Sequence, residues 1–533
     1  MTARVTRRAF GTAFAAGLLV RPGHARDAGT LTATWGEAAG RGGEPRALHV
    51  PSGGGPIATM VASKMLERLA RRGIDSGAFI GVLAEGWRPS PDFTAYTIRL
   101  RRGVRFHDGT AMTADDVVFS MAGIWRKHAE PEAMEDVTGI EAIDASTVVV
   151  RWNRPVPPFA FGSLLCGPAS FVVPRHLHDG ADPRDLAGDD APVGTGPFRL
   201  RHWLRGSRIE LERNRDYWRG RPPLDRLVLR PIDDAADRAA ALEAGEVQLA
   251  LFDAVTPADA RRLVATGRFV ETARGYEEPG LATTLACNTR RSPLDSREVR
   301  QAIFHALDRP FIARSIFAGR ARAGSGPILS TNKALFSADL HRLDHSPSRA
   351  RALLDAAGHR ATESRRFALT LVVADWWPTN RKVGAYVRQA LGEIGVAVEI
   401  VVVDRPTALR RIYTDYDFDL ALSNQANPCE PVPWTTRRYT SDGIRPGQPF
   451  GNASGHADPG LDRLAARIAT ETGIYERRDL VAEFQRVVAR DAPLLPLVEH
   501  APVTVAAATV RNHSDDANFA AASWHDLGLA AEL

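Results

Sequence analysis

The chain has 533 residues, of which 44% are hydrophobic and 25% are charged, and its formal net charge is +5. A chain of this length forms about two to four domains with large buried cores, and the composition is ordinary for a soluble globular protein. The positive charge is not gathered into a lysine run, and no aromatic and arginine module of the RNA-binding type is present. Composition therefore argues against a nucleic acid as the partner.

The first residues have the layout of an export signal. Arg7 and Arg8 precede a short apolar run over residues 10–20, and small residues follow. The run is too short to cross a bilayer as a helix, which needs about 20 residues, and no later stretch is apolar enough to do so. We expect residues 1–25 to be a twin-arginine-like signal peptide and the mature chain to lie in the periplasm.

The stretch 103–120, "GVRFHDGTAMTADDVVFS", contains a histidine and three carboxylates, a combination that metal and hydrolase sites also use. Alternation of apolar and polar residues predicts a strand that ends in a turn at Asp108. Thr113 fits a helix N-cap, and Asp115 and Asp116 then lie in the first turn, where the helix dipole favours negative charge. These carboxylates are thus explained without a ligand.

Two later regions, 224–317 and 366–423, alternate predicted strands with predicted helices. Such alternation favours parallel or mixed sheets covered by helices, so the chain contains two separate α/β regions. Between the helical part of 103–120 and the first of these regions, a hairpin is predicted over 198–211. The Gly194-Thr195-Gly196 motif precedes this strand rather than a helix, so it is not a dinucleotide phosphate loop.

Cysteines and histidines give little sign of a metal centre. The three cysteines, Cys166, Cys287 and Cys429, are far apart in the sequence. This spacing favours cysteines that act as separate small apolar residues, although three cysteines allow one disulfide bond. Two histidine pairs lack a cysteine or carboxylate partner at a familiar spacing; they are His176 with His178 and His341 with His345. We expect neither a metal site nor a cofactor.

Several phrases in fixed order resemble the family 5 solute-binding proteins of ABC importers, a family that includes oligopeptide, dipeptide and nickel-complex binders. The phrases are "LAEGWRPSPDFTAYTIRLRRGVRFHDGTAMTADDVVFS" (from Leu83), "PVGTGPFRL" (from Pro192), "ERNRDYWRGRPPLDRL" (from Glu212), "NTRRSPLDSREVRQAIFHALDR" (from Asn288), "ARALLDAAG" (from Ala350) and "DAPLLPL" (from Asp491). The resemblance spans nearly the whole mature chain, and its specificity comes from the number of matches in order.

This resemblance implies an α/β fold of the two-lobed periplasmic binding protein type (class II, flytrap) with an additional α+β subdomain. The implied division is a first lobe over 26–60, 190–272 and 491–533, an extra subdomain over 61–189, and a second lobe over 273–490. Chain segments that cross twice between lobes would act as a hinge, so that closure buries a ligand. On this view His107 and Asp108 belong to a scaffold signature of the subdomain.

In an open α/β sheet, ligands bind beyond the carboxyl ends of strands. This rule selects three loops with candidate ligand-binding residues: Trp35 and Glu37 in the first, Trp376 and Trp377 in the second, and Asn424, Gln425 and Asn427 in the third. The tryptophan pair fits either cleft lining or packing within a lobe, since aromatic residues dominate both.

The third loop departs from the family's pattern. In peptide-binding members it commonly carries an aspartate that pairs with the peptide's amino terminus, a strong charge-assisted contact. Here the loop reads "SNQANPCEPVPW", which contains amides and no aspartate, and Glu430 is the nearest carboxylate. Peptides, sugars, opines, other small solutes and metal chelates therefore all remain open as ligands.

The resemblance implies a monomeric binding protein that captures a peptide or other small solute and presents it to ABC permease subunits at the inner membrane, with no catalytic residues. An exported hydrolase or metalloenzyme is the main alternative, but the sequence has neither GxSxG nor HExxH. A sensory or chaperone partner built on the same fold is a second alternative, because fold alone does not decide function.

Overall fold

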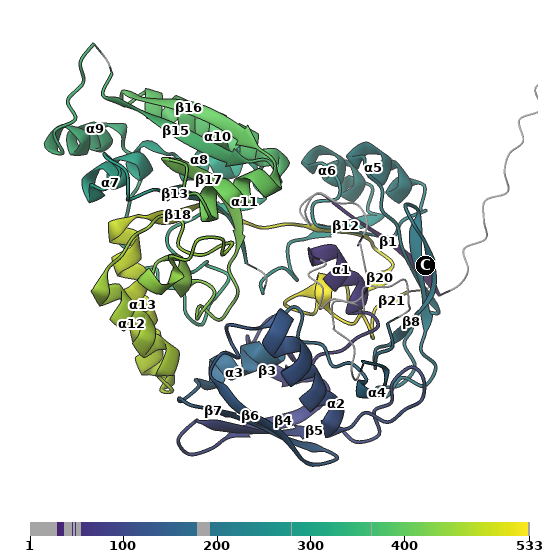
Figure 1. Cartoon of the computed structure of the whole chain (residues 1–533). Helices are drawn as coiled ribbons and strands as arrows, with labels where there is room; N and C mark the ends of the chain where they lie inside the picture. The colour runs from purple at the N-terminus through teal and green to yellow at the C-terminus, as the bar shows by residue number, and fades with distance from the viewer. Residues whose placement is uncertain are drawn as a thin grey trace, which may run out of the picture.

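The computed structural model describes residues 29–36, 45, 48, 55–178, 192–278, 280–363 and 365–530. These residues form two large sheets, each with its own helices, and a smaller sheet in a separate subdomain (Figure 1). The expected signal peptide, 1–25, lies outside the described residues. None of the helices within the described ranges is both long enough and apolar enough to cross a membrane.

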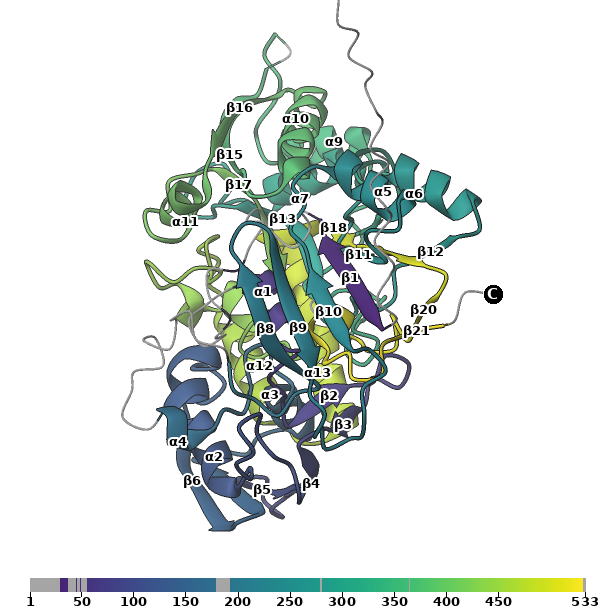
Figure 2. The same ribbon diagram turned by 90° about the vertical axis from the view of Figure 1, so that its right-hand side faces the viewer.

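The first sheet has seven strands in the order β12-β19-β11-β1-β10-β9-β8, and Figure 2 shows β8, β9, β10 and β1 side by side. The strands are β1 (Thr30–Trp35), β8 (Phe198–Leu204), β9 (Arg208–Arg213), β10 (Arg226–Leu229), β11 (Leu249–Leu251), β12 (Phe269–Thr272) and β19 (Thr504–Ala507). The central strand β1 runs parallel to both of its neighbours. Leu31 and Ala33 lie on the same face of this strand and are fully buried in the core of the first lobe.

Helices cover this sheet and extend its core. They are α1 (Gly55–Ala62), α5 (Ala235–Glu243) and α6 (Pro257–Ala265), and a short hairpin of β20 (Val510–Arg511) and β21 (Gly528–Leu529) lies near the C-terminus with the 3-10 helix η8 (Phe519–Ala521). The hairpin predicted over 198–211 is confirmed.

The second sheet has six strands in the order β14-β18-β13-β17-β15-β16. They are β13 (Leu281–Cys287), β14 (Ala321–Ala323), β15 (Phe367–Ala374), β16 (Val396–Val403), β17 (Leu420–Ala426) and β18 (Leu494–His500). Strand β15 is parallel to β16 and β17, while β13 is antiparallel to β17 and β18. The sheet is therefore mixed, as the alternation of strands and helices predicts.

Helices surround the second sheet on several sides. They are α7 (Arg297–Ala306), α8 (Arg309–Phe311), the π-helix η5 (Ile312–Ile316), α9 (Pro347–Ala356), α10 (Pro378–Gly392), α11 (Arg405–Tyr413), the 3-10 helices η6 (Thr436–Arg438) and η7 (Ser441–Gly443), α12 (Pro459–Thr470) and α13 (Ile474–Asp491). The last two form an arm that reaches toward the subdomain in Figure 1.

Within the residues that the structure describes, the chain passes from one large sheet to the other at two places. Residues 273–280 lead from β12 to β13, and residues 501–503 lead from β18 to β19. We expected every residue from about 491 onward in the first lobe, but β18 pairs with β13 and β14 in the second sheet. All residues of β18 are buried, and the sequence pattern of a fully buried strand fits either of the two sheets. Only the tertiary structure therefore shows which sheet β18 joins.

The subdomain contains an antiparallel sheet in the order β4-β5-β7-β6 and its own apolar core. Its strands are β2 (Ala70–Arg72), β3 (Phe79–Gly81), β4 (Ala84–Pro89), β5 (Ala95–Leu100), β6 (Val137–Asp144) and β7 (Thr147–Trp152). Its helices are α2 (Ala114–Phe119), the π-helix η3 (Ser120–Ala129), α3 (Pro158–Leu165) and α4 (Arg175–His178). It lies at the bottom of Figure 1.

The stretch 103–120 has the structural role that its sequence predicts. The Asp108 carboxylate accepts a hydrogen bond from the Thr110 N–H at 2.9 Å and so closes the turn. Helix α2 begins after Thr113, whose N–H donates to the Asp116 carboxylate at 2.8 Å, as in a capping box.

The three cysteines are buried and have free thiols.

Candidate ligand-binding site

A cavity of about 620 Å³ lies where the two lobes and the subdomain meet. The subdomain contributes residues within 128–169, the first lobe contributes Phe252 and residues of 518–521, and the second lobe contributes residues within 424–477. Cavities of this size between domains are typical sites for small molecules. No single unit contains the site, so its shape depends on how the three units are held together.

The units contact one another around the cavity. Arg437 of the second lobe donates through Nη1 to Glu132 Oε1 of the subdomain at 2.6 Å. Arg154 of the subdomain donates to the Ala469 carbonyl oxygen at the end of α12, at 2.8 Å. Arg320 of the second lobe donates to the Val255 carbonyl oxygen of the first lobe at 2.9 Å. These contacts close the structure around the cavity.

Much of the cavity wall is apolar. Trp152 and Phe161 of the subdomain line it and pack edge to face, with ring centroids 5.7 Å apart. Trp434 of the second lobe also lines it, and the Arg437 guanidinium lies 4.5 Å from the centre of its ring. An apolar wall removes water from a ligand and strengthens each polar contact made inside.

Most of the arginines in the wall already have an acidic partner. Besides Arg437 and Glu132, Arg477 on α13 donates to Glu430 Oε1 at 2.6 Å, and Arg154 donates to Asp136 at 2.5 Å. Arg477 and Glu430 are both about 95% buried, with exposed fractions of 4% and 5%. Glu430 is therefore committed to an ion pair rather than directed at a ligand.

Three other charged residues in the wall lack such an ion pair among the described residues: Glu130, Glu278 and Arg438. Burial, and then the charge of Glu132, raise the pKa of Glu130 to about 8. Burial, and then the charge of Asp516, raise the pKa of Glu278 to about 7. Burial lowers the pKa of Arg438 to about 10. Unpaired ionisable groups in a cleft with shifted pKa values are typical of functional sites.

Of the residues selected from the sequence, Asn424 lines the cavity. Its Oδ1 accepts hydrogen bonds from Trp376 Nε1 at 3.0 Å and from Asn380 Nδ2 at 2.6 Å. Its Nδ2 donates to Thr283 Oγ1 at 2.9 Å. The Asn424 amide thus joins β17 to β13 and to the start of α10.

The other selected residues lie elsewhere or hold the loops in place. Gln425 is buried and donates to the Tyr413 hydroxyl at 3.3 Å, and Asn427 donates to the Pro327 carbonyl oxygen at 2.6 Å. Trp35 belongs to the core of the first lobe. None of these is among the described residues that line the cavity, and Glu37 lies outside the described part of the chain.

The two adjacent tryptophans have different surroundings. Trp376 is 9% exposed and belongs to the core of the second lobe. Trp377 packs against the cores of both lobes, and its ring lies 4.8 Å from that of His500. Of the two alternatives left open by the sequence, the structure thus places both indoles in packing rather than in the described lining of the cavity.

Sequence reasoning missed the residues that the subdomain and the crossing segment contribute. Trp152 and Phe161 look like ordinary core residues in the sequence, and Glu278 follows no strand end. The pair Arg437-Arg438 gave no signal in the sequence either, because the chain has several other adjacent arginines and only the structure shows that these two are buried.

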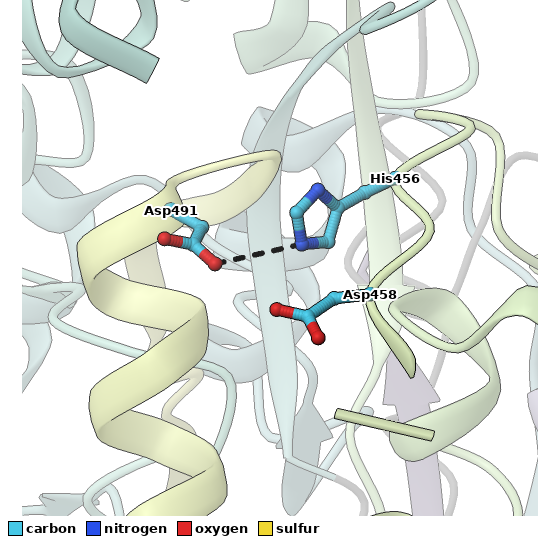
Figure 3. Close-up of side chains that lie close together, drawn as sticks. All are labelled: His456, Asp458 and Asp491. Atoms are coloured by element: carbon cyan, nitrogen blue, oxygen red, sulfur yellow. Dashed lines mark ion pairs between the residues drawn. The ribbon is translucent and has the colours of Figure 1, made fainter. Parts of the chain in front are cut away.

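One group of side chains within the described residues has a geometry compatible with a metal ion (Figure 3). His456, Asp458 and Asp491 offer ligand atoms that all lie within 4.8 Å of one another. Arg490 donates to both oxygens of Asp491, at 2.8 and 3.2 Å, and Asp458 accepts from the Gly460 N–H as the N-cap of α12. Both carboxylates are thus engaged, and none of the three residues lines the cavity.

Comparison with known proteins agrees with this architecture. Residues 78–445 match the family "Bacterial extracellular solute-binding proteins, family 5 Middle". The probable di/tripeptide-binding protein 5 of Pseudomonas aeruginosa is 28% identical, over 82% of this chain and 84% of that protein. The glutathione-binding protein GsiB of Salmonella choleraesuis is 27% identical, over 78% of this chain and 80% of that protein.

Solved structures show the same two-lobed fold. The periplasmic binding protein DppA of Helicobacter pylori, in complex with the peptide STSA, has a TM-score of 0.76 and 23% identity, and the match covers 95% of this chain and 98% of that one. NikZ of Campylobacter jejuni, in complex with Ni(L-His), has a TM-score of 0.77 and 19% identity, over 94% and 99% of the two chains. Since the family match covers most of the sequence and the fold agrees with it, the chain belongs to the bacterial extracellular solute-binding proteins of family 5.

Proposed function

We propose that this protein is the solute-binding component of an ABC importer and that it binds a small peptide or peptide-like solute between its lobes. The observation that carries the proposal is the cavity of about 620 Å³ built jointly by both lobes and the subdomain. Relatives named for di/tripeptides and for glutathione support a peptide-like solute. The protein would be exported to the periplasm through residues 1–25, act as a monomer and deliver its solute to permease subunits.

The two chain crossings support a hinge mechanism. Within the described part of the chain, the main chain passes between the large sheets at residues 273–278 and 280 and at residues 501–503. In the proposed division, the first lobe contains the sheet of β1, the second lobe contains the sheet of β13 and the subdomain contains β4 to β7. A ligand that contacts both sides stabilises the closed form, because those contacts exist only when the lobes meet.

A thermal-shift screen tests the proposed function. At a hundred times its dissociation constant, a bound solute should stabilise the protein by about 2.7 kcal/mol. The screen would use di- and tripeptides, glutathione, opines, sugars and nickel with histidine. Trp434→Ala removes an apolar wall of the cavity and should weaken any solute found, whereas Trp203→Ala is a matched control outside it.

Trp203 is a suitable control because, like Trp434, it has an arginine guanidinium packed over its ring. The guanidinium of Arg205 lies 3.3 Å from the centre of the Trp203 ring. Equal loss of affinity in both variants would contradict the site. Failure of every solute to stabilise the protein, or turnover of a peptide by the purified protein, would contradict the function.

Arg437→Met tests the contact between the second lobe and the subdomain. The Arg437 to Glu132 ion pair joins units that separate on opening, so its loss should destabilise the closed form alone. We expect a solute from the screen to bind about 10-fold to 100-fold more weakly, mainly through faster dissociation, as for loss of a charged hydrogen bond. Titration calorimetry and stopped-flow fluorescence would measure these changes.

Two controls separate this effect from general damage. Adding Glu132→Gln to the Arg437→Met variant should lower the affinity for the solute little further, because both substitutions remove the same ion pair. Arg445→Met, at an exposed site of the same lobe, should leave affinity unchanged. A lower melting temperature of the solute-free Arg437→Met protein, with unchanged affinity, would show that the pair does not act on closure.

A further inference from the structure

Two of the three cysteines line the cavity, and they come from units on opposite sides of the closing interface. Cys166 follows the last residue of α3 in the subdomain, and Cys429 lies beyond the end of β17 in the second lobe. The third, Cys287, is fully buried in the core of the second lobe, where it acts as a small apolar side chain. Of the three cysteines, Cys166 and Cys429 are therefore the pair whose surroundings change when the cavity opens.

The closed structure brings these two thiols to the same residue. The Cys166 thiol donates to the Ser163 carbonyl oxygen at 3.5 Å, and Cys429 Sγ lies 3.5 Å from Ser163 Oγ. Ser163 belongs to α3, so the Cys429 contact joins the second lobe to the subdomain. Both sulfurs thus contact one serine, although they are not bonded to each other.

The main chain at each cysteine is held within its own unit. The Cys166 N–H donates to the Ser163 carbonyl oxygen at 3.3 Å, at the end of α3. The Cys429 carbonyl oxygen accepts a hydrogen bond from Asn332 Nδ2 of the second lobe at 2.6 Å. The distance between the two sulfurs therefore changes when the second lobe moves against the subdomain. A disulfide requires Cα atoms within about 7 Å of each other, so this pair can be bridged only while the protein is closed.

Opening of the cavity controls how readily these thiols react, because the thiolate is the reactive form of cysteine. Burial is the main reason that the pKa of Cys429 rises to about 11 and that the pKa of Cys166 rises well above its ordinary value. Opening admits water to both side chains, since both line the cavity, and this removes the cost of ionisation. A small oxidant therefore reacts with the open protein, first at Cys429, whose thiolate the nearby charge of Arg72 also favours.

Resting on the function proposed above, we propose that Cys166 and Cys429 form a redox-controlled lock, in which a disulfide between them holds the second lobe on the subdomain. The oxidant is a small-molecule disulfide such as glutathione disulfide. The locked protein would keep its solute in the closed cavity, and release would resume once the disulfide is reduced. The oxidation state of two cysteines would thus decide when the solute can leave.

The chemistry consists of two successive thiol–disulfide exchanges. In the first, the Cys429 thiolate attacks one sulfur of glutathione disulfide, a bond forms between Cys429 and glutathione, and the sulfur–sulfur bond of the oxidant breaks. The leaving glutathione thiolate takes up a proton in place of the one that Cys429 lost. After closure, the Cys166 thiolate attacks Cys429 Sγ and releases the second glutathione in the same way. Two cysteine thiols are oxidised, and one glutathione disulfide is reduced to two molecules of glutathione.

Peptide mapping after oxidation tests the bond. Reduced, solute-free protein is incubated with glutathione disulfide, its remaining thiols are alkylated, and its digest is analysed by mass spectrometry without reduction. The wild type should yield a peptide pair that joins Cys166 to Cys429. Cys166→Ser should stop at a mixed disulfide between Cys429 and glutathione, and Cys429→Ser should form no lock. Cys287→Ser, the matched control, should form the lock like the wild type.

Two further measurements test whether the bond holds the protein closed. In small-angle X-ray scattering, the oxidised, solute-free wild type should have a smaller radius of gyration than the reduced protein, and dithiothreitol should reverse the change. For a solute present during oxidation, stopped-flow fluorescence should show dissociation slowed by about 10-fold or more, because the bond opposes opening. Cys287→Ser should respond like the wild type in both measurements, and Cys166→Ser should respond in neither.

The outcomes separate the lock from the function on which it rests. If the oxidised wild type yields no peptide pair of Cys166 and Cys429, or if the pair forms without a change in scattering, the lock is wrong. Contraction of the oxidised protein, with no solute of any class bound in the screen, would support the lock and contradict the proposed function. Should a serine variant not fold by circular dichroism, mapping and scattering of the wild type before and after dithiothreitol decide.

Discussion

Arg477→Met is expected to lower the free energy of unfolding by about 3–5 kcal/mol, because it leaves the buried Glu430 carboxylate without its counterion. The pair is 2.6 Å apart, and both side chains are almost completely buried. Arg477 Nε also donates to the Ile468 carbonyl oxygen at 3.0 Å, so the guanidinium joins α13 to the end of α12. Urea unfolding followed by far-UV circular dichroism would measure the change.

Two further variants give this prediction its controls. Arg478→Met changes the next residue, which is exposed, and should alter stability by no more than about 0.5 kcal/mol. The double variant Arg477→Met with Glu430→Met should recover much of the loss, since replacing a whole buried ion pair by apolar groups is often neutral. A single Arg477→Met variant as stable as the wild type would show that Glu430 finds another partner or reaches water.

Glu130→Gln is expected to make the protein less sensitive to rising pH. Burial raises the pKa of Glu130 from its ordinary value of 4.5 to about 8, so the folded state holds this proton more tightly than the unfolded chain does. Between these two values the unfolded chain binds fewer protons, and the free energy of unfolding therefore falls as pH rises through this window. At pH 8 the loss from this one group is on the order of 4 kcal/mol as an upper bound.

The glutamine variant keeps the shape of the carboxylic acid but has no proton to lose. Its midpoint of urea unfolding should exceed that of the wild type at pH 8, and the difference should shrink or reverse at pH 5. Glu135→Gln is the matched control, because Glu135 is exposed and lies three positions beyond Glu132. Parallel pH profiles for the wild type and Glu130→Gln would mean that Glu130 ionises without cost in the folded protein.

The sequence by itself determined the local structure and the family of this protein. Alternating apolar residues identified the strands, and the turn and capping residues of 103–120 identified the start of α2 without any tertiary contact. These features depend on neighbours within a few residues, so they can be read from spacing. The ordered family phrases then indicated the two-lobed fold, which the matching structures confirm.

Only the tertiary structure decided which side chains meet in the cavity. The rule of strand ends selected residues at the end of β17, but Asn424 and Gln425 belong to the strand rather than to the loop after it, and of the selected residues within the described chain only Asn424 lines the cavity. The amides there hydrogen-bond to neighbouring strands and loops, and the indoles fill the cores. Spacing along a chain cannot show whether a polar side chain bonds to its own lobe or points into a cavity.

The charge pattern of the site also depends on the tertiary structure and cannot be read from the sequence. Glu132 and Arg437 come from the subdomain and the second lobe, and Glu430 and Arg477 come from two separate segments of the second lobe, so each pair forms only once the chain has folded. Glu278 and Arg438 stand out only once those partners are known. Whether a charge is neutralised depends on distances of a few ångströms between segments that the chain order does not bring together, because Coulomb interactions act through space.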